Sequence, residues 1–301
     1  MIDRPIFIIG CNRSGTTLLF RNLSMHPDLW SLYIESQDEF YRHWPIDPEQ
    51  GDRVAELPAP KVADALARDL YHSAHNKEQF RDAPVLGAIP PKLLQRPLGV
   101  LWKRPPIRLV EKTPANTLRV PMLARVFPDA RFVFIVRRGE DVVSSLMEGW
   151  KNWSETEDES AWRYTKWHYL VPPGWQEWTG RPLEDICTFQ WTSSTETAKT
   201  DLERWAPDRY VELRHEDLIA DPTAGYRRIA EFCDLRASKS FDRVIESATD
   251  RLFTTGGSKP RSDKWKRLHY AEIMRVREKI EALNAKYYED PEIDTAPILR
   301  T

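Results

Sequence analysis

The sequence predicts an α/β fold in which a central parallel sheet is flanked by helices. Short segments rich in apolar residues occur at residues 6–9, 107–110 and 131–136, and such segments are typical of strands buried in a parallel sheet. Each run leads through a polar turn into a stretch with helical periodicity, which is the strand–helix order that builds such a sheet. The chain has 301 residues, enough for one large domain with a substantial core.

Composition narrows the classes of function. With 41% hydrophobic and 30% charged residues the chain is typical of a soluble globular protein, and its net charge of −2 argues against a general nucleic-acid binder. Cys11, Cys187 and Cys233 are far apart, which excludes a disulfide scaffold or a thiolate zinc cluster. No apolar run is long enough to span a membrane, and no signal peptide precedes the first strand, so we expect a cytoplasmic protein without a membrane anchor. Homo-oligomerisation stays open.

The first strand and helix enclose a turn suited to phosphate. Ile6–Ile9 is followed by the polar turn Gly10–Gly15, and a helix is expected from Thr16 to Met25. Backbone N–H groups and the positive end of the helix dipole converge there. The glycine spacing matches a Walker A loop, but Thr16 replaces its lysine and the cation comes earlier, as Arg13. The alternative is a corner without a ligand, in which the threonines only cap the helix.

Two stretches depart in composition from the rest of the chain. Residues 45–106 hold ten prolines and one helical stretch, and residues 150–178 hold six of the twelve tryptophans. We expect a single domain over residues 1–301, in which insertions at 45–106 and 150–183 cover the substrate. Indole rings there could stack on a sugar or an aromatic ring. The alternatives are a surface excursion for the first stretch and rings packed against the main domain for the second.

A second phosphate-type pattern follows the strand at residues 131–136. Arg137 ends the strand and Ser145 comes eight residues later, on the helix that follows. An arginine offers a charged fork and a serine a hydroxyl, and both suit a phosphate group. The neighbouring Arg138 and Ser144 are expected to point away from the phosphate group. The alternative is that the two arginines close the strand by ion pairs with acidic residues at 140 and 141. Two phosphate-type patterns on successive strand–helix units are less readily explained by chance than one pattern alone.

The remaining segments continue the fold. We expect a second strand at residues 29–34, a helix at 117–127, a helix at 185–205, a strand at 210–213, a helix at 222–233 and a closing helix at 270–288. His215 follows the strand at 210–213 and is expected to be structural. A basic, glycine-bearing stretch at residues 256–266 precedes the closing helix.

Residues 12–17 resemble the 5′-phosphosulfate loop of sulfotransferases that use 3′-phosphoadenosine 5′-phosphosulfate (PAPS), whose loops read Pro-Lys/Arg-Ser-Gly-Thr-Thr. The segment at 137–145 resembles the 3′-phosphate motif of that family, and residues 256–266 its C-terminal cofactor loop, although with looser spacing before Trp265. The resemblance, to the tyrosylprotein and carbohydrate-type members and their bacterial relatives, implies a P-loop-like sulfotransferase fold. It implies these PAPS-binding residues: Arg13, Ser14, Gly15, Thr16, Thr17, Arg137, Ser145, Ser258, Arg261 and Lys264.

The same resemblance implies the catalytic residues. Glu35 matches the general base that takes the proton of the acceptor hydroxyl, with Glu39 and His43 as alternative bases, and it could instead cap the following helix. Arg13 and Lys112 would stabilise the charge that grows on the leaving phosphate. No metal is implied. The acceptor stays open among a sugar, a tyrosine or other phenol, a lipid and a secondary metabolite.

Two other functions remain compatible with the sequence. A P-loop nucleotide kinase or NTPase would require magnesium and ATP, and the missing Walker lysine argues against it. A non-catalytic protein that binds PAPS or its product PAP would share the phosphate loops and lack turnover.

Overall fold

The computed structural model describes residues 2–32, 35–44, 47–54, 58–75, 108–154, 167–246, 263–290 and 292–293. The strands are β1 (Ile6–Ile9), β2 (Leu29–Trp30), β3 (Arg108–Glu111), β4 (Arg131–Val136) and β5 (Tyr210–Arg214). The helices are α1 (Thr16–Leu23), α2 (Gln37–His43), α3 (Pro60–His75), α5 (Val120–Val126), α6 (Gly139–Ser154), α7 (Leu183–Trp205), α8 (His215–Ala220), α9 (Pro222–Phe232), α10 (Lys239–Glu246), α11 (Lys264–Leu268), α12 (Tyr270–Arg275) and α13 (Arg277–Asn284), with 3₁₀ turns η2 (Pro114–Leu118) and η4 (Trp175–Trp178).

The five strands of the described residues form one parallel sheet in the order β2-β3-β1-β4-β5. In the register, Ile6 pairs with Arg131 and Ile9 with Phe134, so β1 and β4 end side by side. The parallel sheet flanked by helices that the sequence predicted is therefore confirmed. Because β3 and β4 lie on opposite sides of β1, the chain changes direction across the sheet at β1. In open α/β sheets ligands bind at such a point, beyond the carboxyl ends of the strands.

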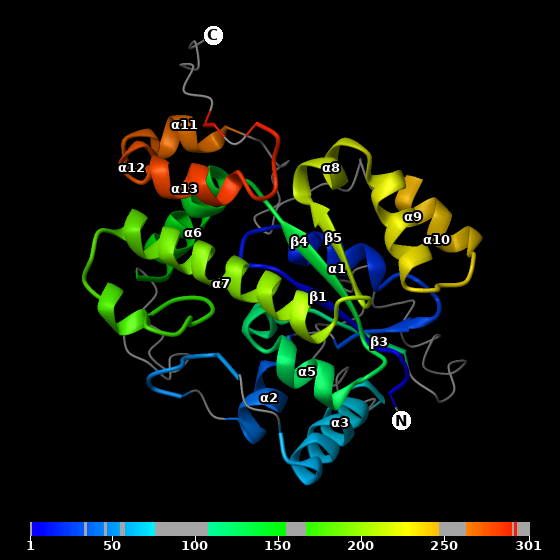
Figure 1. The fold of residues 1–301 in the computed structure, drawn as a ribbon. Coiled ribbons are helices and arrows are strands. Elements are labelled where there is room, and N and C mark those ends of the chain that lie inside the picture. Colours follow the sequence, from blue (N-terminus) through cyan, green and yellow to red (C-terminus); the bar gives the residue numbers. More distant parts are fainter. Residues whose placement is uncertain are drawn as a thin grey trace, which may run out of the picture.

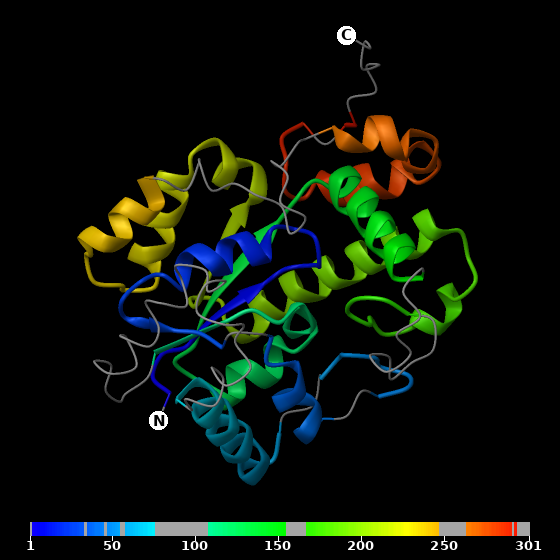
Figure 2. The same cartoon turned by 180° about the vertical axis from the view of Figure 1, so that it is seen from behind.

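Each face of the sheet packs against its own set of helices (Figures 1 and 2). Side chains alternate between the faces along a strand. Phe7 and Phe132 point into one cluster with residues of α5 and α7. Ile8 and Val133 point the other way, into a cluster with α1 and α9. These two layers bury every residue of β1 and explain why its sequence is apolar without alternation.

A third cluster joins the C-terminal helices to the main layer. Side chains of α6, α7, α12 and α13 pack together around Trp191, and Cys11 of the first turn contributes to the same cluster. Figure 1 shows α11, α12 and α13 grouped at the end of the sheet where α6 begins. The helices at the end of the chain thus lie beside the turn that follows β1.

Several predicted elements differ in extent. The expected strand at 29–34 is only two residues long, and the expected helix at 117–127 is the 3₁₀ turn η2 followed by α5. The division lies at Arg119, and within η2 the hydroxyl of Thr117 bonds the backbone of Gly10 in the first turn. The closing helix at 270–288 is two helices, α12 and α13, which meet at Val276. Nothing in the local sequence marks that break.

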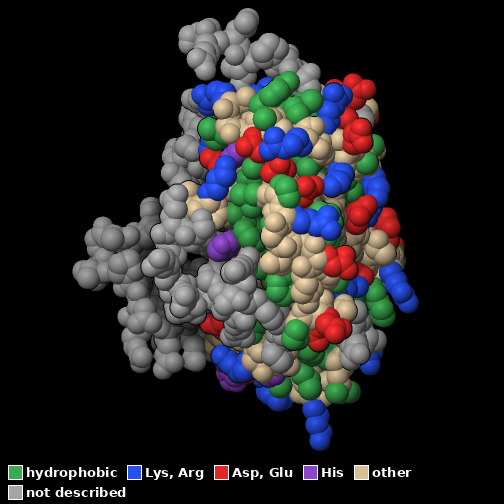
Figure 3. All heavy atoms as spheres, turned by 90° about the vertical axis from the view of Figure 1, so that its left-hand side faces the viewer, with side chains coloured by type: hydrophobic (Ala, Val, Ile, Leu, Met, Phe, Trp, Pro, Cys, Tyr) green, Lys and Arg blue, Asp and Glu red, His purple; other side chains and the backbone are tan. Residues whose placement is uncertain are grey.

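The surface matches the nearly neutral composition. On the face drawn in Figure 3, side chains of both charge signs are interspersed between apolar ones, without one extended basic region. In the part of the chain that the structure describes, no helix is long and apolar enough to cross a membrane.

Candidate functional site

The turn after β1 is shaped by two glycines that make close contacts. A Cβ atom on Gly10 would lie 2.6 Å from the carbonyl oxygen of Ile135 in β4. Gly15 has φ +95°, and a Cβ atom there would lie 2.4 Å from Cδ2 of His215. Only glycine fits both the left-handed backbone and the contact at position 15. The first N–H groups of α1, which lack partners inside the helix, therefore open onto the end of the sheet.

Three of the predicted phosphate-binding residues meet at this turn. Arg13 donates from Nε to Oγ of Ser145 over 2.9 Å, and Arg137 donates from Nη1 to the carbonyl oxygen of Arg13 over 3.1 Å. The contact joins the first turn to α6, which lies 132 residues further along the chain. The structure thus brings together the two sequence patterns that resemble phosphate motifs. Ser14 and Thr16 are buried in the same turn, and Thr17 is half-buried.

Among the described residues, only some of the hydrogen-bond donors of the Arg137 guanidinium have partners. Its Nη2 lies 3.3 Å from Oδ2 of Asp141 on the first turn of α6, as the ion-pair alternative predicted. Its Nε is buried and has no hydrogen-bond partner among the described residues. Burial raises the pKa of the Asp141 carboxyl, and the Arg137 guanidinium opposes that rise. A buried guanidinium nitrogen without a partner fits an anionic ligand, since such donors are rarely left unpaired.

Glu35 and Lys112 form an ion pair at the carboxyl ends of β2 and β3. The Lys112 ammonium contacts Oε1 of Glu35. The Lys112 side chain is 8% exposed and that of Glu35 is 39% exposed, so the carboxylate is open to solvent while the ammonium is not. Both residues come after strands, and the carboxyl ends of these strands lie at the same end of the parallel sheet as the turn that follows β1. A carboxylate and a cation side by side can accept a proton and stabilise developing negative charge, respectively.

The two alternative bases are engaged elsewhere. Oε1 of Glu39 accepts a hydrogen bond from the hydroxyl of Ser73 over 2.6 Å. Nε2 of His43 lies 2.9 Å from Oδ2 of Asp69. Both contacts hold α2 against α3. Of the three candidates, Glu35 is therefore the one whose carboxylate contacts Lys112.

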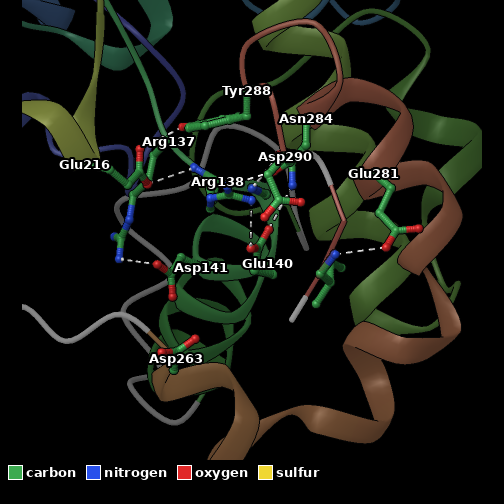
Figure 4. A network of polar contacts seen from close by, with 12 residues as sticks. Arg137, Arg138, Glu140, Asp141, Glu216, Asp263, Glu281, Asn284, Tyr288 and Asp290 are labelled. Atoms are coloured by element: carbon green, nitrogen blue, oxygen red, sulfur yellow. Dashed lines mark hydrogen bonds and ion pairs between the residues drawn. The ribbon is translucent and has the colours of Figure 1, made fainter. Parts of the chain in front are cut away.

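A polar network fixes the corner between β4 and α6 (Figure 4). Glu216 of α8 accepts a hydrogen bond from the backbone N–H of Arg138 over 3.1 Å and another from the hydroxyl of Tyr288 over 2.7 Å. The guanidinium of Arg138 lies over the ring of Tyr288 and donates to the carbonyl oxygen of Asp290. Arg138 therefore points away from Arg13, as the sequence predicted.

The first N–H group of α6 has a partner in the same network. Oδ1 of Asn284 accepts from the backbone N–H of Gly139 over 3.1 Å, and its Nδ2 donates to Oε2 of Glu140 over 3.0 Å. The side chain of Asn284, near the end of α13, thereby caps α6. Sequence reasoning missed Glu216 and Asn284, because no local pattern joins residues this far apart.

The C-terminal cofactor loop is described only in part. Ser258 and Arg261 lie outside the described residues. Nζ of Lys264 lies 2.9 Å from both carboxylate oxygens of Glu148, one turn beyond Ser145 on α6. Besides burial, the negative charge of Asp263, the residue before Lys264, contributes to the raised pKa of the Asp141 carboxyl. The beginning of α11 thus lies along the same helix as the predicted 3′-phosphate serine.

The described part of the tryptophan-rich stretch is packed. Trp150 and Trp167 are buried and meet edge to face, with ring centroids 5.4 Å apart. Trp178 stacks on Phe189 at 4.6 Å. Trp162 lies outside the described residues. The segment that follows Trp167 reaches the first turn, because Oδ1 of Asn12 accepts from the backbone N–H of Leu170 over 3.2 Å.

His215 is a buried neutral side chain behind the first turn. Burial, reinforced by the charge of Arg137, lowers its pKa to about 3. A neutral imidazole at that place adds no further positive charge beside Arg137. Within the described residues, no three His, Cys, Asp or Glu side chains gather in a way that could hold a metal ion.

Comparison with known proteins identifies related sequences. A model of the sulfotransferase family matches residues 5–239. An omega-hydroxy-beta-dihydromenaquinone-9 sulfotransferase of Mycobacterium tuberculosis is 26% identical over 273 residues, which cover 77% of this chain and 63% of the relative. A putative protein-tyrosine sulfotransferase of Caenorhabditis briggsae is 24% identical over 245 residues, which cover 79% of this chain and 68% of the relative. The chain therefore spans less than two thirds of the mycobacterial relative.

The fold has a counterpart among solved structures. The crystal structure of a sulfotransferase from Mycobacterium avium superposes with a TM-score of 0.54 at 16% identity, over 96% of this chain and 78% of the other. At this level of identity the likeness concerns the fold alone.

Proposed function

The chain belongs to the sulfotransferase family, and we propose that it transfers a sulfuryl group from PAPS to the hydroxyl group of an acceptor by in-line displacement. The observation that carries this proposal is the meeting of Arg13, Ser145 and Arg137 at the N-terminus of α1. A loop of backbone amides and two guanidinium groups there suit a ligand that carries phosphate at two places.

The residues of the site fit PAPS in kind and in charge. The N–H groups at the start of α1, with Ser14, Thr16 and Thr17, would hold the 5′-phosphosulfate. Arg137 and Ser145 would hold the 3′-phosphate, and Nε of Arg137, which has no partner among the described residues, supplies a donor for it. Lys264 would add a cation from the C-terminal side, after leaving Glu148. We extend the same proposal to Ser258 and Arg261, on the resemblance alone.

Glu35 would remove the acceptor proton. The acceptor oxygen forms a bond to sulfur while the bond from sulfur to the bridging phosphate oxygen breaks, and PAP leaves with the electron pair. Lys112 is placed to stabilise the negative charge that grows on that oxygen, and Arg13 can do so from the loop. Because Lys112 already contacts Glu35, one motion of the lysine toward the phosphosulfate would free the carboxylate for the acceptor.

Binding of PAP tests the first half of the proposal. Calorimetry would compare PAP with ATP and magnesium on the wild type, on Arg137→Ala and on Arg131→Ala. Loss of one charged partner should weaken PAP binding by about 2 kcal/mol, or roughly 30-fold. Arg131 begins the same strand and makes an ion pair with the exposed Asp234, so its replacement removes an arginine far from the turn. Tight binding of ATP with magnesium and no binding of PAP would refute the proposal in favour of a kinase.

Turnover tests the second half. Wild type with ³⁵S-labelled PAPS would be offered a tyrosine peptide, 4-nitrophenol, a long-chain primary alcohol and an alkyl glycoside, which represent the phenol, lipid and sugar classes of acceptor. The relatives named for dihydromenaquinone and for protein tyrosine make the alcohol and the peptide the first choices. Labelled product is the expected result. PAP binding without transfer to any acceptor or to water would instead support a non-catalytic PAP-binding protein.

A further inference from the structure

The last residue of β3 is a buried carboxylate surrounded by donors. Glu111 is 2% exposed. Its Oε1 accepts hydrogen bonds from the hydroxyls of Ser36, over 2.6 Å, and of Thr113, and its Oε2 accepts from Nδ2 of Asn116 over 2.7 Å. The backbone N–H of Ser36 lies 3.5 Å from Oε1. A carboxylate that bonds both the segment at Ser36 and the turn at residues 113–116 is an anchor for the two.

The directions of these bonds show which atoms donate. Oδ1 of Asn116 accepts from the guanidinium of Arg119 over 3.4 Å, so its Nδ2 is the atom turned toward Glu111. Oγ1 of Thr113 accepts from the N–H of Ser36 over 3.0 Å, so its own proton is free for Glu111. Both carboxylate oxygens therefore act as acceptors, as in the ionised form. Burial raises the pKa of Glu111, and these hydrogen bonds oppose the rise.

Both members of the catalytic ion pair are neighbours of this anchor in sequence. Ser36 follows Glu35 directly, and Lys112 follows Glu111 directly. The bond between Ser36 and Glu111 joins segments 75 residues apart. It therefore sets the position from which the Glu35 carboxylate meets the Lys112 ammonium.

The same anchor reaches the phosphate loop. Asn116 lies in η2, and the next residue, Thr117, accepts from the N–H of Gly10 over 3.0 Å and donates to its carbonyl oxygen over 2.9 Å. The base segment and the first turn are thus tied to the same short helix. A buried charge is costly to desolvate, and well-packed apolar residues would often serve stability equally well. Fixing the register of separate segments is a role that apolar residues would not fill.

We propose that Glu111 and Ser36 are positioning residues, which hold Glu35 beside Lys112 at the distance that the transfer step requires. The inference rests on the proposed function, because it assigns a purpose to the geometry of that site. A displacement of about 1 Å at a reacting group can cost about 100-fold in rate. We therefore expect kcat to fall about 100-fold in Glu111→Gln, which places an N–H₂ group among donors, and about tenfold in Ser36→Ala.

A double-mutant cycle separates positioning from general damage. Ser36→Ala is combined with Glu35→Gln, and kcat and the KM for PAPS are measured with whichever panel acceptor the wild type uses fastest. If Ser36 acts through Glu35, the tenfold loss seen in the wild-type background should shrink to less than twofold once the carboxylate is gone. PAP affinity by calorimetry should stay within twofold in every variant of the cycle. Ser36→Ala removes only one hydroxyl, so the test stands even if Glu111→Gln does not fold.

Ser144→Ala is the matched control. Ser144 is also buried and also gives one side-chain contact, to Nδ1 of His269 over 2.8 Å, and it belongs to neither the ion pair nor its anchor. Its kcat should stay within twofold of the wild type. An equal loss from Ser36→Ala in both backgrounds, or a matching loss of PAP affinity, would overturn the positioning role and leave the proposed function intact. A wild type that neither binds PAP nor transfers sulfate would overturn both.

Discussion

Replacement of Gly15 by alanine tests the geometry of the proposed phosphate loop directly. Gly15 precedes α1 with φ +95°, and the added Cβ atom would lie 2.4 Å from Cδ2 and 3.1 Å from Nε2 of His215. The ring cannot move away freely, because His215 is buried between the first turn and the core. The substitution therefore combines a strained backbone with a steric overlap, and the two contributions can be separated.

The expected magnitude follows from these two contributions. A left-handed backbone costs a non-glycine residue roughly 1–2 kcal/mol, and overpacking of a well-filled site costs roughly 1–3 kcal/mol, so Gly15→Ala should lose about 2–5 kcal/mol of folding free energy. In a chain of this size, 1 kcal/mol corresponds to about 2 °C in Tm, which gives a decrease of about 4–10 °C. PAP affinity should fall as well, because the N–H groups of the loop are displaced.

The double variant Gly15→Ala with His215→Ala isolates the overlap. Removing the imidazole makes room for the new methyl group, so the losses in Tm should fall short of additivity by about 2–6 °C, while the backbone strain remains. Differential scanning calorimetry of the wild type, both single variants and the double variant measures this coupling. Additive losses in Tm would show that the two residues do not touch, and the placement of α8 behind the loop would then be wrong.

Three further predictions concern charges at the site. Glu35→Gln should lower kcat at least 100-fold, as loss of a general base does, while Glu39→Gln stays within threefold because Glu39 bonds α3 instead. Lys264→Ala should weaken PAP binding about tenfold at low salt and less at high salt, while Lys279→Ala, which breaks a similarly exposed ion pair, leaves it unchanged. His215 is neutral when folded and has a pKa near 6.5 when unfolded, so the unfolded chain binds the extra proton between about pH 6.5 and 3. Stability should therefore fall with falling pH in that range by about 4–5 kcal/mol, and His215→Gln should flatten that part of the unfolding curve.

Each of these has a result that would contradict it. Equal losses of kcat in the two glutamate variants would mean that contact with Lys112 does not identify the base. Equal PAP affinity for both lysine variants would remove Lys264 from the cofactor site. A His215→Gln protein that loses stability with acid as steeply as the wild type would place the acid-sensitive group elsewhere.

Local sequence determined the parts of the fold that depend on local contacts. The strand at 131–136 was predicted with its observed bounds, because five consecutive apolar residues that are rich in β-branched and aromatic side chains and lie between two turns are typical of a strand with both faces covered. The turn from β1 to α1 was predicted for a similar reason, since glycines and polar residues between a strand and a helix leave few conformations. Element ends that depend on distant groups were not predictable in this way. Thr117 is an ordinary helix residue by pattern, and its bond to Gly10 is visible only in three dimensions.

In the candidate site, too, the features that depend on local sequence were predictable and those that depend on distant contacts were not. Its residue types could be placed at the carboxyl ends of strands, where parallel strands gather them, and Arg13, Arg137 and Ser145 do lie together. The pairing among them was not predictable, because a sequence does not say that Arg13 bonds Ser145 while Arg137 bonds Asp141. The groups that support the site, such as Glu216 and Asn284, have no local sequence pattern that predicts their contacts.

The corner between β4 and α6, which carries Arg137, shows why contacts from distant residues matter. The family match ends at residue 239, yet the N–H of Gly139 at the start of α6 is capped by Asn284, and Tyr288 holds Glu216 against the N–H of Arg138. An arginine that binds a phosphate needs a fixed backbone, since a displaced fork loses its paired hydrogen bonds. The C-terminal helices provide that fixation from outside the matched region. The corner that carries Arg137 is therefore completed by residues from the far end of the chain, and the sequence around β4 gives no sign of them.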